Sequence, residues 1–210
     1  MRIRTYKLVA VVLTLAAFAH TVRADSEKSK EYQIKAAFIY NFIKFVDWPK
    51  EKKADANEPI MIGIIGSENF IKAFEPIKGK KVKDRSISIK YFAGYEKLVR
   101  SNDADNRQWD KKIEALKVCN VLMFCSSNSV CMQNSNQILK SLKNLPILTV
   151  GETEDFLESG GVVNFLMEDK KVHFEINNKT AKQAKLNIRS KLLRLAKKVI
   201  EEETPDKTET

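Results

Sequence analysis

Hydrophobic residues follow two different periods in the first third of the chain. Over residues 32–48 they recur three or four positions apart, as on an amphipathic helix, and Pro49 ends that run. Residues 59–66, PIMIGIIG, form a short unbroken apolar run between a proline and a glycine, which is typical of a strand buried on both faces. The sequence therefore predicts a helix, then a strand, then a second helix with Ser67 as its N-cap.

The same alternation continues along the chain. Residues 84–93 alternate apolar with polar side chains, as in a half-buried strand, whereas 119–124 and 146–150 read as buried strands. The segments 109–118 and 129–144 between and beside them have helical periodicity. Strands that alternate with helices across short loops favour a mostly parallel sheet with right-handed crossovers, so we predict a single three-layer α/β domain.

Three further elements are predicted after the last parallel strand. Residues 152–159 suggest a short helix, and residues 161–176 a hairpin that turns at Glu168–Lys171 and adds an antiparallel edge. Residues 177–202 have the period of one long C-terminal helix. Beside its main apolar stripe this helix carries spare apolar positions that fit a second copy of the chain, so we predict a homodimer through Leu186, Leu193, Ala196 and Ile200.

The N-terminus has the layout of a signal peptide. Arg2, Arg4 and Lys7 precede an uncharged apolar run over 8–19, which is shorter than the roughly 20 residues of a membrane span. Small residues then favour cleavage after Ala24, with cleavage after Ala19 and an uncleaved anchor as the alternatives. We therefore predict a signal peptide over 1–24, export to the periplasm, and a polar tail over 203–210.

Removal of the leader also changes the charge. The whole chain has 37 basic and 27 acidic residues, a formal net charge of +10. Residues 1–24 hold four basic residues and no acidic one, so 33 basic residues remain against 27 acidic ones, a net charge of +6. The basic residues are scattered in small clusters, and an exported protein seldom meets nucleic acid, so we predict no nucleic-acid partner.

Three cysteines lie in the exported part, and an oxidising compartment favours one disulfide. Cys119 and Cys125 share one predicted strand, which would hold them about 20 Å apart, too far to bond. Cys125 and Cys131 flank a five-residue loop that a disulfide can close. A Cys119–Cys131 pair and three reduced thiols are the alternatives.

No stretch of the sequence carries a catalytic or metal-binding motif. Gly63–Gly66 is only part of a phosphate-binding glycine pattern, and a tight turn explains it. His173, predicted to share a strand face with Glu175, has neither further histidines nor a nucleophile elbow to work with. Glu152 and Glu154 open a predicted helix, where acids are expected. We predict no cofactor, no metal and no enzyme activity, but a binding role.

The first helix carries the most specific binding signal. It is apolar nearly all round, so it must be covered on more than one side, by the sheet and by either the C-terminal helix or a second chain. Asn41 lies among Phe38, Phe42 and Phe45, and we expect it to be buried with a hydrogen-bond partner.

Several of these stretches together resemble the YfiR family of periplasmic proteins. The opening IKAAFIYNFIKFVDWP, then IMIGIIGSENF and CNVLMFCSS, and finally PILTVGETEDFLESGGVVNF with the segment that follows it, occur in that family's order and spacing. The resemblance runs from about Tyr32 to Val199, with 78–118 as the least similar part, and a domain over 32–200 is expected.

The resemblance implies a Rossmann-like fold, dimerisation and a regulatory role. Its best-known members are periplasmic inhibitors that bind the sensor domain of an inner-membrane diguanylate cyclase, hold the cyclase inactive and so lower cyclic-di-GMP and biofilm formation. The family's use of disulfides is similar to the Cys125–Cys131 pairing. The alternative is a small-ligand-binding sensory module with a pocket lined by residues such as Phe38, Phe42 and Phe156. The candidate partner-binding residues are Phe38, Asn41, Phe42, Phe45, Gly160, Gly161, Leu193 and Ile200.

Overall fold

The computed structural model describes residues 27–49, 58–66, 69–95, 98, 106–125 and 129–202, and for residues 69 and 129–134 it describes the backbone alone. The predicted signal peptide, the Ser67 cap and the polar tail lie outside the described residues. Among the helices that are described, none combines the length and the apolar character needed to cross a membrane.

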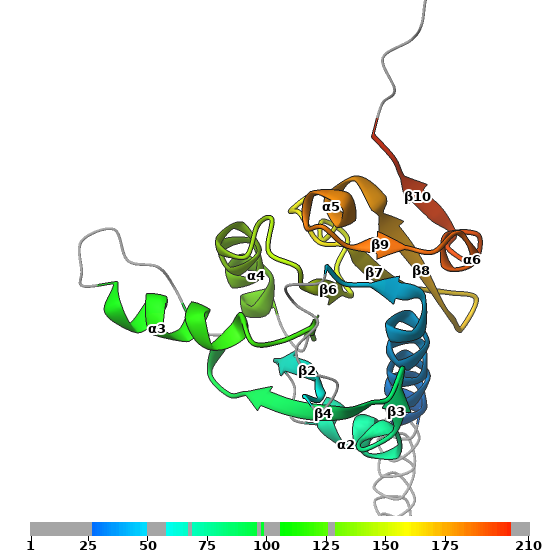
Figure 1. Ribbon diagram of the computed structural model, residues 1–210, viewed down its shortest axis with the longest axis horizontal. Coiled ribbons are helices and arrows are strands. Elements are labelled where there is room, and N and C mark those ends of the chain that lie inside the picture. The colour runs from blue at the N-terminus through cyan, green and yellow to red at the C-terminus, as the bar shows by residue number, and fades with distance from the viewer. Residues whose placement is uncertain are drawn as a thin grey trace, which may run out of the picture.

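Eight of the described strands form one large sheet, which is mostly parallel (Figure 1), and β1 (Val46–Asp47) and β9 (Asn187–Ile188) form a separate two-stranded sheet. Its strand order is β10-β8-β7-β6-β5-β2-β4-β3, and only the β7–β8 and β3–β4 pairs are antiparallel. The predicted fold class is confirmed. The strands are β2 (Ile60–Ile65), β3 (Lys81–Val82), β4 (Arg85–Phe92), β5 (Val121–Phe124), β6 (Leu148–Gly151), β7 (Val163–Glu168), β8 (Lys171–Asn177) and β10 (Lys198–Ile200).

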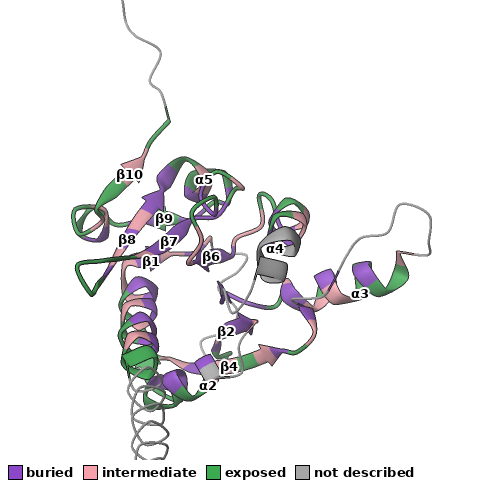
Figure 2. Ribbon diagram, turned by 180° about the vertical axis from the view of Figure 1, so that it is seen from behind, coloured by how far each residue is buried: buried purple, intermediate pink, exposed green. Residues whose placement is uncertain are grey.

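Helices cover both faces of this sheet and make two hydrophobic cores. The N-terminal helix, described over 27–45, and α2 (Asn69–Phe74) pack on the face to which Ile62 and Ile64 point. The helices α3 (Arg107–Leu116) and α4 (Ser129–Ser141) pack on the other face, with Ile65, Leu122 and Phe124. Buried residues concentrate on the strands and on the helix faces toward them (Figure 2).

The predicted hairpin is present, but it is not the edge of the sheet. Glu168 pairs with Lys171 across a two-residue loop, in which Asp169 and Lys170 have φ of 49° and 60°, as a type I′ turn requires. The strand β10 pairs in parallel with β8 and takes the edge position.

The predicted long C-terminal helix is wrong. The segment forms α5 (Asn178–Gln183), β9 (Asn187–Ile188), α6 (Ser190–Leu193) and β10. The helix α5 ends in a Schellman motif, because Lys185 has φ of 55° and Leu186 N–H donates to Ala181 O at 2.9 Å. The strand β9 then pairs with β1 (Val46–Asp47). Tertiary pairing thus overrides the helical period, and most of the main apolar stripe is still buried.

The predicted short helix over 152–159 is also wrong, because this stretch forms consecutive turns. The turns close with Gly161 N–H donating to Phe156 O at 2.9 Å. They place the Phe156 side chain between strands and turn, where it is buried. A loop of consecutive turns therefore follows β6, and its first residues, Glu152 to Glu154, line a pocket.

Candidate functional site

A pocket of about 500 Å³ opens beside the carboxyl end of β6. The strand β6 pairs with β7 only through Val150–Val163 and Gly151–Asn164, so β7 runs on past the end of β6 and leaves a notch beside it. Open α/β sheets usually hold ligands outside the carboxyl ends of their parallel strands. The lining residues are Lys28, Glu31, Tyr32 and Lys35 of the N-terminal helix, Glu152, Thr153 and Glu154 after β6, Asn164, Phe165, Leu166 and Met167 of β7, and Glu175 of β8.

A buried ion pair forms the deepest charged part of this pocket. Lys35 Nζ lies 2.5 Å from Glu152 Oε2, and the two side chains are 4% and 6% exposed. The same ammonium also donates to Glu31, one helical turn earlier and 26% exposed. A buried charge needs such partners, and the triad joins the N-terminal helix to the loop after β6.

The carboxylates of Glu31 and Glu152 help to raise the pKa of two neighbouring side chains, Lys35 and Tyr32. Burial on its own would lower the pKa of Lys35, but Glu152 and Glu31 outweigh it and raise that pKa above its ordinary value. Burial raises the pKa of the Tyr32 phenol, and Glu152, Cys125 and Glu31 raise it further. Lys35 therefore stays charged and Tyr32 stays neutral at physiological pH.

Neither Lys35 nor Glu152 is predicted as a site residue from the sequence pattern. Glu152 is predicted to lie in the first turn of a helix that does not form. The signal was nonetheless present, because Lys35 lies three residues after buried Tyr32 and four before buried Ile39, on the inward face of the helix. A lysine at such a position requires a carboxylate from elsewhere in the chain.

The four predicted partner residues of the first helix fall on different sides of it. Phe42 is fully buried, with its ring 5.8 Å from that of Phe165 and 4.9 Å from that of Phe174. Phe38 and Phe45 are half-buried. The expectation that Asn41 is buried is wrong: it is exposed, and Lys44 Nζ lies 3.4 Å from its Oδ1.

One edge of the helix is only partly covered, although Phe38 and Phe45 pack against the margin of the core. We define it as the outer helix strip, made of Ile34, Phe38, Asn41 and Phe45. Ile34 is 46% exposed, unusually high for so large an apolar side chain. The C-terminal segment covers only the last turn, where Lys191 Nζ lies 5.5 Å from the Phe45 ring centroid. The rest of the strip is a surface on which a partner can pack.

Gly160 and Gly161 of the turn differ in the space around them. Gly161 is buried, and a side chain there would meet the Phe156 ring at 2.1 Å, so packing accounts for this glycine. Gly160 is exposed with φ of 96°, and a Cβ there would have no atom within 4 Å. Gly160 is thus open to a partner, and a second cavity, of about 310 Å³, lies beside it.

Leu193 and Ile200 do not share one helix face. Leu193 ends α6 and packs at the margin of the core that holds the N-terminal helix, whereas Ile200 lies on β10 and packs at the margin of the other core. Both are half-buried, while Leu195 between them is 65% exposed. The apolar surface of this segment therefore centres on Leu195.

Cys125 is buried directly after β5, and Cys119 is buried before it. The side chain of Cys131 lies outside the described residues, so the pairing of Cys125 with Cys131 stays a prediction. In the part of the chain that the structure describes, no three His, Cys, Asp or Glu side chains are grouped closely enough to hold a metal ion.

A model of the YfiR/HmsC-like family matches residues 32–197. The chain belongs to the YfiR/HmsC-like family. The family is one of periplasmic regulators of diguanylate-cyclase signalling. The family is regulatory and not catalytic. No curated protein sequence matches the chain significantly.

Two solved structures have a similar backbone at low sequence identity. A conserved domain protein from Vibrio cholerae is 10% identical with a TM-score of 0.50, over 80% of this chain and 60% of its own. An ABC domain in complex with L-Trp from Streptococcus pneumonia is 11% identical with a TM-score of 0.48, over 67% of this chain and 55% of its own. The chain thus spans 55% to 60% of these structures, and the first likeness shows the fold alone.

Proposed function

We propose that this YfiR/HmsC-like protein binds the periplasmic sensor domain of an inner-membrane diguanylate cyclase and holds the cyclase inactive. Cyclic-di-GMP and biofilm formation are then low while the complex persists. The family match over residues 32–197 carries this proposal. A cleaved leader that ends at Ala24 would deliver the protein to that compartment.

The mechanism is a population shift. A regulator that binds one conformation of its client more tightly draws the client into that conformation, and a differential affinity of about 5.5 kcal/mol moves a two-state equilibrium from 1:99 to 99:1. The outer helix strip supports this role because it offers half-exposed aromatic side chains on a rigid helix. Gly160 and the hairpin β7–β8 are a second candidate contact.

Deletion of the gene tests the proposal. We expect cyclic-di-GMP and biofilm mass to rise, and both to return to the original level when the gene is restored. An Ile34→Asp variant should be exported and folded, because Ile34 is 46% exposed, but it should not restore them, because a charge on the outer helix strip would have to be desolvated at the interface. A Lys30→Asp variant, at an exposed position on the same helix, is the control. Unchanged cyclic-di-GMP after deletion would refute the proposal.

The pocket beside β6 favours a second function, that of a small-ligand-binding sensory module. Its volume of about 500 Å³ lies within the usual range of ligand sites, roughly 300–1,000 Å³, and its walls combine charged and apolar groups. A ligand that binds only the folded protein raises its melting temperature. A screen of small molecules that finds no such rise would contradict this function and leave the regulatory one untouched.

A further inference from the structure

We propose that the pocket beside β6 binds a small organic cation, a molecule with one or more amino groups on an apolar stem. The proposal rests on the second function above and names its class of ligand. It is carried by the acidic lining of the pocket and by its aromatic and thioether walls.

The pocket is acidic although the protein is basic. Its lining has two lysines and four glutamates, a net charge of 2 − 4 = −2, in a chain whose formal charge is +10. Two of the glutamates belong to the triad with Lys35. The other two, Glu154 and Glu175, have no ion-pair partner among the described residues. These two carboxylates attract a cation that enters the pocket.

The buried lysine does not turn the pocket into an anion site. Lys35 already donates to Glu152 and Glu31, and its pKa is raised by them. An anionic ligand would have to displace one of these carboxylates and meet the remaining ones at close range, and like charges so placed repel each other. An incoming ammonium group would pair with Glu154 and Glu175, and the lining cations that oppose it are the exposed Lys28 and the already paired Lys35.

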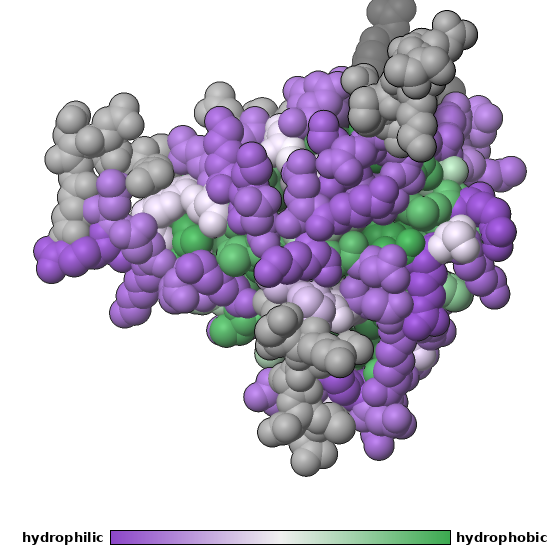
Figure 3. Space-filling view, turned by 45° about the horizontal axis from the view of Figure 1, so that its top comes forward, coloured by the Kyte–Doolittle hydropathy of each residue, from purple (hydrophilic) through white to green (hydrophobic). Residues whose placement is uncertain are grey.

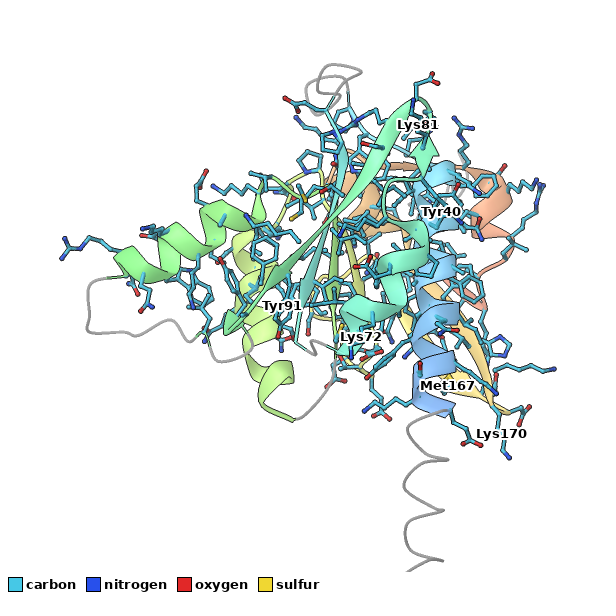
Figure 4. All side chains as sticks on the ribbon, turned by 90° about the horizontal axis from the view of Figure 1, so that it is seen from below. Tyr40, Lys72, Lys81, Tyr91, Met167 and Lys170 are labelled. Atoms are coloured by element: carbon cyan, nitrogen blue, oxygen red, sulfur yellow. The ribbon has the colours of Figure 1, made fainter. Side chains whose placement is uncertain are left out.

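The walls suit the apolar part of such a molecule. Phe165 is almost fully buried at the base, and Lys35 Nζ lies 5.9 Å from its ring centroid and equally far from that of Tyr32. These rings thus already face an ammonium group in the folded protein. Met167 is 48% exposed and lies beside the N-terminal helix at the mouth (Figure 4). A flexible thioether at this place can cover an alkyl stem.

The two carboxylates come from different elements, which favours an extended cation over a metal ion. A metal ion needs several ligands around one point, and no three acidic, histidine or cysteine side chains of the described residues meet that condition. Glu154 lies on the loop after β6 and Glu175 on β8, with β7 between the two strands. A molecule whose charges are separated by a short stem matches carboxylates that are separated in this way.

Calorimetric titration of the exported protein tests the proposal. The probes are spermidine and 1,5-diaminopentane, with glutarate and 1,5-pentanediol as an anionic and a neutral molecule of the same length. We expect the two amines to bind, with an affinity that falls as salt is added, and the diacid and the diol not to bind. Glu154→Gln and Glu175→Gln should each weaken amine binding roughly fivefold.

Glu158→Gln is the matched control, because Glu158 is exposed in the same loop but lines the other cavity. Its amine affinity should be unchanged. Binding of the diacid or the diol in place of the amines would overturn the cation proposal and leave the ligand-binding function standing. Amine binding that neither glutamine variant weakens would also overturn it, because the amine then binds elsewhere. If no probe binds, the cation proposal fails, and the loss or gain of cyclase inhibition in cells still tests the regulatory function separately.

Discussion

The Lys35 side chain connects two segments that are far apart in the sequence. It extends from the N-terminal helix to Glu152, 117 positions later in the chain, and both side chains are almost fully buried. A buried pair of this kind adds little net stability over an apolar pair of similar size, but the loss of one partner leaves the other charge uncompensated. Substituting one partner and then both therefore distinguishes the net contribution of the ion pair to stability from the cost of leaving one buried charge unpaired.

Lys35→Met should lower the free energy of unfolding by about 3 kcal/mol, because Glu152 loses its closest counter-charge while it stays buried. The double variant Lys35→Met/Glu152→Leu should recover most of that loss. Urea unfolding of the two single variants and the double variant measures this coupling. Lys30→Met, at an exposed position of the same helix, should change little. Additive losses in the double variant would show that the two side chains are not coupled.

Asp47 joins three segments through its carboxylate. Arg189 donates to it with Nε at 2.9 Å and Nη2 at 3.1 Å, and Lys83 Nζ lies 2.5 Å from Oδ1. The hydrogen bonds from Arg189, followed by those from Lys83, lower the pKa of Asp47 from 3.8 to about 2, although its partial burial opposes this.

A lowered pKa means that the folded protein prefers the charged carboxylate. The stability from Asp47 is therefore fully present above pH 3.8 and is lost as the pH falls toward 2. We expect the difference in unfolding free energy between the original protein and Asp47→Asn to shrink over that range. Urea unfolding between pH 2 and pH 5 measures it. A difference that stays constant across this range would contradict the assigned pKa.

At the scale of elements, the hydrophobic periodicity predicted the parallel strands correctly. It failed over 177–202 and after β6, where backbone turns determine the structure. The strands β2, β4, β5 and β6 and the hairpin are close to their predicted positions, because a buried strand needs an uninterrupted apolar run. Over 177–202 the spacing of apolar residues also fits a helix, and nothing in it marks Lys185 as left-handed. The pocket was missed for a related reason, since it depends on a loop that was predicted to be a helix.

A substitution at Lys185 tests the structure of this segment, because its effect on the free energy of unfolding has opposite signs in a Schellman motif and in a continuous helix. In a Schellman motif a glycine suits the left-handed position, so Lys185→Gly should raise the free energy of unfolding by roughly 1 kcal/mol. In the middle of a continuous helix the same change would lower it by a similar amount. Gln183→Gly, inside α5, should be destabilising and serves as the control in thermal or urea unfolding.

At the scale of the whole molecule, the face seen in Figure 3 is mostly polar, with smaller apolar patches between the polar side chains. The C-terminal segment has an exposed apolar side chain of its own, Leu195, which is 65% exposed. If the predicted homodimer uses this segment, light scattering on the exported protein should give twice the chain mass, and Leu195→Glu should give a single chain mass. Val118→Glu, at an exposed apolar position outside that segment, is the control. A monomer at high concentration would contradict the dimer.

The pairing of β1 with β9 has a consequence for how the chain folds. Val46 lies opposite Ile188, and Arg189 N–H donates to Phe45 O at 2.9 Å, so the end of the N-terminal helix is anchored by residues far later in the chain. Contacts between such distant positions require a long loop to close, which slows folding. The native arrangement therefore cannot be completed until residues 187–189 have emerged, and the predicted export of the chain as an extended polypeptide would benefit from that delay.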